Sequence, residues 1–121
     1  MLGEPIAKHL VEAVARYLEQ VAVPALEGHA AFHGKVAINV LAIVARELEL
    51  GPAAAAAEHA RLAGLLGEDG DLDALRRSLC ARLMAGEANL DTPGLADHLL
   101  ATVVDRVRIE QPNYTSLKLA P

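Results

Sequence analysis

The chain has 121 residues, 53% of them hydrophobic, and a formal net charge of −5 at pH 7. Because much of the apolar excess is alanine and only Tyr17, Phe32 and Tyr114 are aromatic, the composition favours closely packed helices over a sheet. The acidic balance argues against nucleic acid as a partner, and the single cysteine, Cys80, excludes an intrachain disulfide. No apolar stretch reaches the roughly 18 residues that a membrane span needs, so we expect a cytoplasmic protein that does not cross a membrane.

The first periodic segment predicts a helix from about Pro5 to Val23, since proline suits the first turn of a helix. One stripe of this helix is apolar, and charged residues lie off the stripe. The stripe consists of Ile6, Leu10, Val14, Leu18 and Val21. Pro24 then removes a helical donor, so we expect the chain to break or kink sharply there.

The second predicted helix spans about residues 29–50 and is apolar on more than half of its circumference. Its apolar residues are Phe32, Val36, Val40, Leu41, Ile43, Val44 and Leu48. A helix of this kind is usually central, so we expect other helices to enclose it and a Val40→Asp substitution to destabilise the protein severely. Gly51 is a typical helix stop and Pro52 a typical first-turn residue, which predicts a third helix over about 52–66.

Two further helices follow a GEDGD turn. Asp71 is expected to cap a helix over about 72–85, and Thr92 with Pro93 predicts the start of another over about 93–108. The tail from about residue 109 has no helical period. The sequence therefore predicts an all-α protein, with residues 1–121 forming a single-domain bundle of about five helices around the central helix at about 29–50.

Polar residues interrupt the second helix and form the candidate ligand or partner site, namely His29, His33, Asn39, Arg46 and Glu47. His29 and His33 are one turn apart and could share a metal. However, HAAFH lacks the glutamate of metalloprotease helices, and Glu47 lies about 21 Å along the helix from His33. We predict no metal site, because two histidines leave the tetrahedral shell of zinc half empty.

A structural role for these five residues is the other interpretation. The histidines would then sit at the start of a helix, one in solvent and one hydrogen-bonded inside. Asn39 would be a buried amide that fixes the register of the helices, while Arg46 and Glu47 would mark the exposed end of the helix.

The segment VPALEGHAAFHGKVAINVLAIVAREL resembles an uncharacterised bacterial family of small all-helical proteins, a domain of unknown function. The pattern P-x-L-x-G…F-H-x-[RK]-V-A-x-N-x-L-x-I-V-x-R-E falls here on residues 24–47, and the ending QPNY is also family-like. Lys35 stands where arginine is expected more often. The resemblance implies genes that lie near aminoglycoside-phosphotransferase-like kinases and acyl-CoA dehydrogenases, and it supplies no catalytic residue.

These observations favour a non-catalytic binding or interaction protein, accessory to a phosphotransferase-like or acyl-CoA-metabolising enzyme. The alternative is a small metal- or ligand-dependent enzyme that uses His33 with Asn39, Arg46 or Glu47. The sequence identifies no cofactor. Because the second helix is apolar on so many sides, we expect the protein to form a homodimer or to dock on a protein partner.

Overall fold

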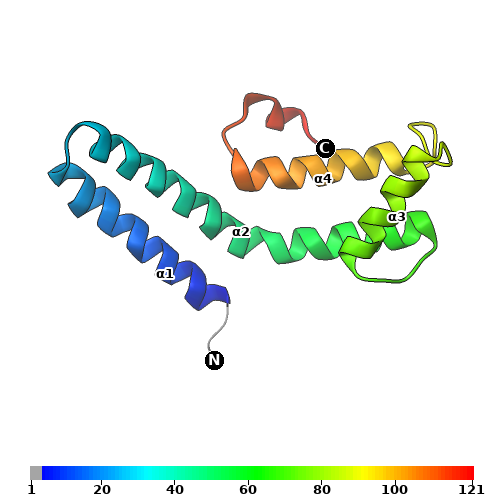
Figure 1. Cartoon of the computed structure of the whole chain (residues 1–121), viewed down its shortest axis with the longest axis horizontal. Coiled ribbons are helices and arrows are strands. Elements are labelled where there is room, and N and C mark those ends of the chain that lie inside the picture. Colours follow the sequence, from blue (N-terminus) through cyan, green and yellow to red (C-terminus); the bar gives the residue numbers. More distant parts are fainter. Residues whose placement is uncertain (1–3) are drawn as a thin grey trace. The chain divides into compact units, whose positions relative to one another are not determined.

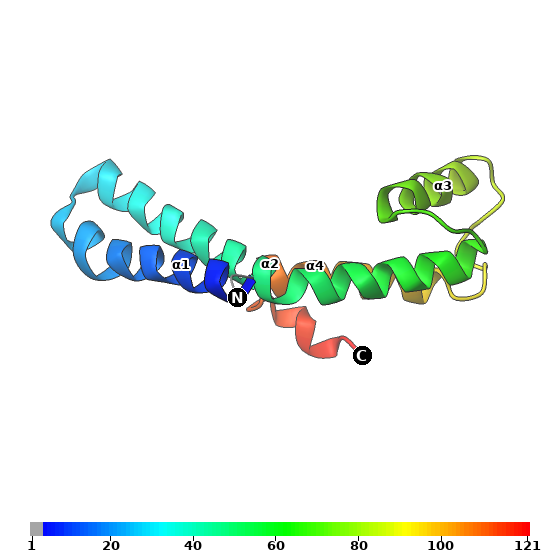
Figure 2. The same ribbon diagram turned by 90° about the horizontal axis from the view of Figure 1, so that it is seen from below.

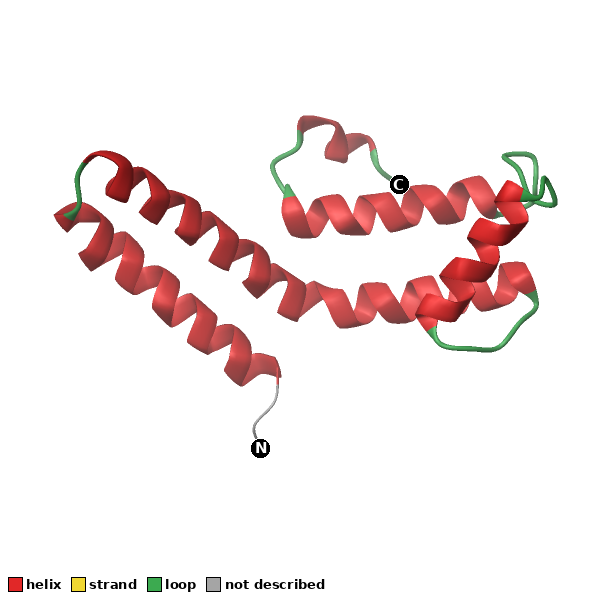
Figure 3. Ribbon diagram, viewed as in Figure 1, coloured by secondary structure: helices red, strands yellow, loops and turns green. Residues whose placement is uncertain are grey.

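The computed structural model describes residues 4–121, which form four α-helices and no strand (Figures 1 and 3). They are α1 (Glu4–Tyr17), α2 (Gly28–Leu66), α3 (Leu72–Met84) and α4 (Leu95–Glu110). The predicted all-α class is confirmed, whereas the number of about five helices is wrong. The two helices expected at 29–50 and 52–66 are one helix, α2, of 39 residues.

The continuity of α2 depends on the pair formed by Gly51 and Pro52. Pro52 lies inside the helix, although a proline ring normally clashes with the Cβ of the residue before it. Gly51 has no Cβ, so it can keep a helical backbone in front of the proline. A Cβ added at Gly51 would lie only 2.5 Å from Oε2 of Glu47. The glycine that was expected to stop the helix therefore permits it to continue.

The chain divides into two compact units, Met1–Pro52 (unit 1) and Ala53–Pro121 (unit 2). The single domain expected over residues 1–121 stays a prediction, and the two units are described in turn. No helix within residues 4–121 is both long and apolar enough to cross a membrane.

Unit 1 is a helical hairpin in which α1 and the first half of α2 run side by side (Figures 1 and 2). After α1 the chain makes a π-helical turn, Leu18–Ala22, and a 3-10 turn, Val23–Ala25, before Leu26 becomes extended. The predicted break at Pro24 is thus confirmed. Gly28 then opens α2 with a φ of 59°, a conformation that glycine adopts without strain. Lys8 and Glu49 form an ion pair of 3.3 Å between the two helices.

The first half of α2 is not the enclosed central helix that the sequence predicts. Of residues 28–52, Ala45 alone is buried, and Val36, Val40 and Val44 are 45%, 50% and 38% exposed. A single neighbouring helix within unit 1 covers only one side of a helix that is apolar on more than half of its circumference. The severe destabilisation expected of Val40→Asp therefore loses its basis, because the new carboxylate would meet solvent.

Unit 2 contains a leucine-rich core formed by the second half of α2, α3 and the start of α4. The buried cluster consists of Leu62, Leu66, Leu75, Leu79, Ala88 and Leu95. Leu75 and Leu79 of α3 and Leu95 of α4 thus pack in this cluster with α2, whereas Leu99, Leu100 and Val103 of α4 remain exposed.

The starts of α3 and α4 differ in how well the sequence predicts them. The Asp71 carboxylate accepts a 2.8 Å hydrogen bond from Ala74 N, which confirms the predicted cap of α3. The Thr92 hydroxyl instead accepts from Asn89 N in the preceding turn. Gly94, with a φ of 83°, stands at the N-cap of α4. The predicted start of that helix at Pro93 is therefore two residues too early.

Candidate functional site

The five candidate residues of α2 lie apart from one another along about 27 Å of helix. His29, His33 and Asn39 are exposed, whereas Arg46 and Glu47 are half-buried. The His33 ring packs edge-on against Phe32, with ring centroids 5.5 Å apart and an interplanar angle of 71°. None of the five lines either of the cavities described below, so their role as a ligand or partner site stays a prediction. Across residues 4–121, no three His, Cys, Asp or Glu side chains gather as metal ligands would.

Unit 1 exposes two rows of apolar side chains, one on each helix. In α1 and the turn after it the spacing is 4-3-4, the spacing of a helix-pairing seam. The members of the two rows, here called the hairpin face, are 38–63% exposed: Leu10, Val14, Tyr17, Val21, Val36, Val40 and Val44.

The direction of the α2 row follows from the position of Gly34. An added Cβ at Gly34 would lie 2.6 Å from Cγ2 of Val23, so this side of α2 faces the other arm of the hairpin. On a helical wheel of about 100° per residue, Val36, Val40 and Val44 lie about 80–160° from Gly34, all turned to one side.

The α1 row points to the same side of the hairpin. In α1 and the turn after it, the half-buried residues mark the side of the helix that faces α2. On a helical wheel, the exposed α1 row lies about 60–120° from that side, and it is turned in the same rotational sense as the α2 row is from Gly34. When two antiparallel helices face each other, residues turned in the same rotational sense from the facing side of each helix lie on the same side of the pair. Lys8 and Glu49, which form an ion pair, each lie about 60° away in the opposite sense and mark the opposite, polar side. Unit 1 thus presents both apolar rows on one side of the hairpin.

In unit 2, a buried carboxylate joins α2 to α3. Glu58 is 8% exposed and accepts two hydrogen bonds from Arg76, of 2.8 Å from Nε and 2.6 Å from Nη2. The hydrogen bonds from Arg76 lower the pKa of Glu58 below its ordinary value, although burial opposes this shift. Both oxygens are occupied by a bidentate partner, so this pair stabilises the packing of the helices.

A second polar cluster joins α2 to α4. Arg61 donates from Nε to Nδ1 of His98 over 3.0 Å and from Nη2 to the Thr102 hydroxyl over 3.1 Å. His98 is 3% exposed. Burial and, second, the charge of Arg61 lower the pKa of His98 below its ordinary value. Because Nδ1 accepts a hydrogen bond, the neutral ring carries its proton on Nε2.

Arg61 and His98 both line an open hollow of about 530 Å3 between the second half of α2 and the start of α4. Gly64 and Leu65 of α2, with Gly94 and Asp97, form other parts of its wall. No local pattern in the sequence indicates this cluster. Arg61 and His98 are 37 residues apart, and neither belongs to a local motif.

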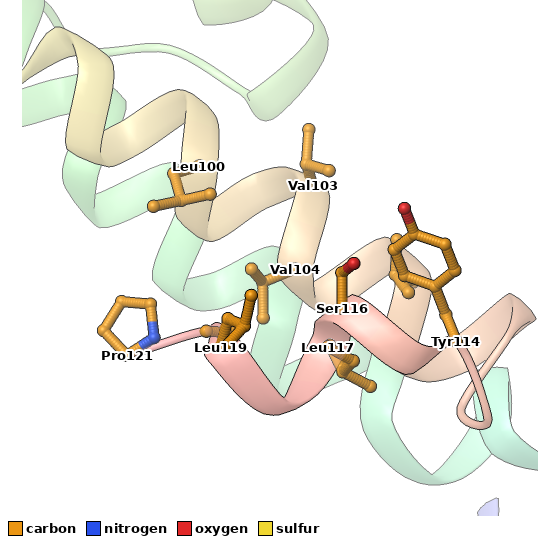
Figure 4. A pocket seen from close by; sticks show the side chains of 10 residues that line it. Leu100, Val103, Val104, Tyr114, Ser116, Leu117, Leu119 and Pro121 are labelled. Atoms are coloured by element: carbon orange, nitrogen blue, oxygen red, sulfur yellow. The ribbon is translucent and has the colours of Figure 1, made fainter.

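An apolar pocket of about 220 Å3 lies between α4 and the C-terminal tail. The tail, which the sequence predicts to be irregular, forms the 3-10 helix Thr115–Leu119 and lies against α4. Figure 4 shows Leu100, Val103 and Val104 of α4 on one side of the pocket and the tail residues on the other. Apolar side chains form most of the pocket wall, and Leu100 and Val103 are about half exposed. We interpret the pocket as incomplete packing of the tail against α4.

Residues 24–114 match the family model of DUF6285, a domain of unknown function. The chain belongs to the DUF6285 family. No curated protein and no solved structure matches it. The DUF6285 match includes α2, α3 and α4 and begins after α1, so it contains the Arg61–His98 cluster and the α2 row of the hairpin face.

Proposed function

We propose that this DUF6285 protein is a non-catalytic interaction protein whose hairpin face docks on a second copy of the same chain. The observation that carries the proposal is the pair of exposed apolar rows on one side of the hairpin. Seven side chains, each about half exposed, present on the order of 600 Å2 of apolar area, which is at the upper end of patches on monomers. A standard interface needs about 800 Å2 from each partner.

A second copy fits this face better than an unrelated partner because the face is half of a four-helix bundle. Such bundles are built from antiparallel hairpins whose seams meet in the middle, and the α1 row has the 4-3-4 spacing of such a seam.

The finer parts of the proposal depend on the resemblance stated for the sequence. They are that the protein is bacterial and that the dimer is accessory to a phosphotransferase-like or acyl-CoA-metabolising enzyme. A cytoplasmic location, which the sequence predicts because no apolar stretch is long enough for a membrane span, is a separate part of the proposal. The alternative, a small enzyme using His33 with Asn39, Arg46 or Glu47, has less support. These side chains are spread along α2, and the first two are exposed on its surface.

Light scattering coupled to size exclusion tests self-association at micromolar concentration. Wild-type protein should have twice the monomer mass of 12.7 kDa. Val14→Asp and Val40→Asp, one on each row, should have the monomer mass with unchanged helix content by circular dichroism. Ala13→Asp introduces the same charge on an exposed residue beside the face and should remain dimeric.

Two results contradict the proposal. A wild-type mass that stays at 12.7 kDa over a tenfold concentration range rules out the stable dimer. Loss of helix content in Val40→Asp means that Val40 lies in an interior, as the sequence alone suggested, and removes the exposed face on which the proposal is built.

A further inference from the structure

The hollow of about 530 Å3 in unit 2 has one positive, one negative and one neutral hydrogen-bonding side chain in its wall: Arg61, Asp97 and His98. A ligand with a single charge of either sign would meet one opposite and one like charge there. A ligand that carries both charges can satisfy both. We propose that this hollow binds a small zwitterion of the amino-acid class, its carboxylate held by Arg61 and His98 and its ammonium group by Asp97.

His98 is the buried part of the site. Its Nδ1 is occupied by Arg61, so its Nε2–H is a donor that still needs an acceptor. Within the part of the chain that the structure describes, every buried side-chain nitrogen or oxygen has a hydrogen-bond partner. No hydrogen bond from Nε2 to a described residue is found, and His98 lines the hollow, so this N–H is the donor that the proposal assigns to a ligand. A ligand carboxylate would supply the acceptor.

Arg61 is held in place before any ligand arrives. Two of the five N–H donors of its guanidinium bond to His98 and Thr102, and the other three of the five remain for a ligand. Because the side chain is already ordered, a carboxylate can bind the remaining donors without the entropic cost of fixing a flexible arginine.

Gly64 lies in the wall of the hollow. It lies in the interior of α2, where glycine is less stable than alanine. Its φ is not positive, and an added Cβ would meet nothing within 4 Å. Neither backbone geometry nor packing therefore requires a glycine here. The missing side chain instead leaves the backbone of α2 open to the hollow, where the body of a ligand can approach.

Asp97 supplies the negative charge. It is an exposed residue in the first turn of α4 that lines the hollow, and no hydrogen bond or ion pair of its carboxylate is found among the described residues. This leaves the carboxylate available for an ammonium group. Asp73 has the same position in the first turn of α3, where it forms a 3.7 Å ion pair with Arg76, and it lies outside the hollow, so Asp73→Asn controls for the loss of a first-turn carboxylate.

Amide NMR spectra of the full-length protein test the site, with glycine, L-alanine and L-leucine as probes and acetate and ethylammonium as probes of half the ligand. At least one of the amino acids should shift the Gly64 and Gly94 signals in a saturable way and leave that of Gly28, in unit 1, unchanged. Each half-ligand should bind about tenfold more weakly or worse, since it loses one charge-assisted contact. The absence of shifts at Gly64 and Gly94 with all three amino acids overturns the proposal.

Two variants separate a binding site from a packing defect. Asp97→Asn should weaken amino-acid binding about tenfold while acetate binds as well as before or better, and Asp73→Asn should change neither. Gly64→Ala should raise the melting temperature, because alanine favours the helix, and should still weaken binding, because its methyl group projects from the wall of the hollow where a ligand would lie. Unchanged binding in both Asp97→Asn and Gly64→Ala would place the ligand elsewhere and reject this site.

Discussion

Replacing Leu62 with alanine tests the core of unit 2. Leu62 is 0% exposed and is surrounded by the other leucines of the buried cluster. The substitution removes three carbon groups, and at about 0.8 kcal/mol for each buried group the lost transfer free energy is about 2.4 kcal/mol. The cavity left among rigidly held neighbours adds to this, so we expect a total loss of about 3–4 kcal/mol in the free energy of unfolding.

Urea unfolding followed by far-UV circular dichroism measures this loss, because the chain has no tryptophan to report by fluorescence. Leu90→Ala is the matched control. Leu90 is 75% exposed, so the same substitution should cost no more than about 0.5 kcal/mol there. Equal and small losses for the two variants would refute the assignment of Leu62 to the core. Amide exchange should localise the effect of Leu62→Ala to unit 2.

Three further predictions concern other parts of the chain. Pro52→Ala should raise the free energy of unfolding by about 1–3 kcal/mol, and with it the urea midpoint, because alanine restores a backbone N–H donor inside α2. A lower urea midpoint would contradict this. When the pH falls from 7 to 5, the free energy of unfolding should fall. The pKa of His98 is lowered in the folded protein, so the unfolded chain takes up a proton on this histidine first, near its ordinary pKa of 6.5. A urea midpoint that stays constant over this pH range would count against a buried neutral ring. His29 and His33 should not hold zinc tightly on their own, and elemental analysis showing about one zinc per chain that is lost in His33→Ala would disprove this.

Local sequence signals predict the elements whose ends depend on a few neighbouring residues. The break after α1 follows from Pro24, and the start of α3 follows from Asp71, whose carboxylate caps the helix. Both signals act within one turn of the chain, so no tertiary information is needed to interpret them.

Signals that depend on their context mislead at two places. Glycine before proline was expected to separate two helices, yet Gly51 removes the Cβ that would have clashed with Pro52, and α2 continues. Thr92 has the residue type of an N-cap but is bound within its own turn, and Gly94 begins α4 with a positive φ. In each case the residue type is compatible with two local structures, so the type alone does not predict which of them forms.

The candidate sites differ in the same way. The histidines of HAAFH stand out in the sequence because they are one turn apart, but both are exposed. Arg61 and His98 do not stand out, because the fold alone brings them within 3.0 Å of each other. Short spacings in the sequence thus point to candidate sites within one helix. A site between two helices consists of residues far apart in the sequence, so no local pattern predicts it.

Hydrophobic content also has two interpretations that the sequence cannot separate. An apolar helix surface can be enclosed in a core, as at Leu62, or remain exposed until another molecule covers it, as at Val40. The distinction has a consequence for experiment, because the hairpin face belongs to unit 1 and the Arg61–His98 hollow to unit 2. Val40→Asp should then change the mass in solution and leave the amino-acid-induced shifts at Gly64 intact. Asp97→Asn should do the reverse, and a variant that abolishes both properties at once would show that assembly and ligand binding depend on each other.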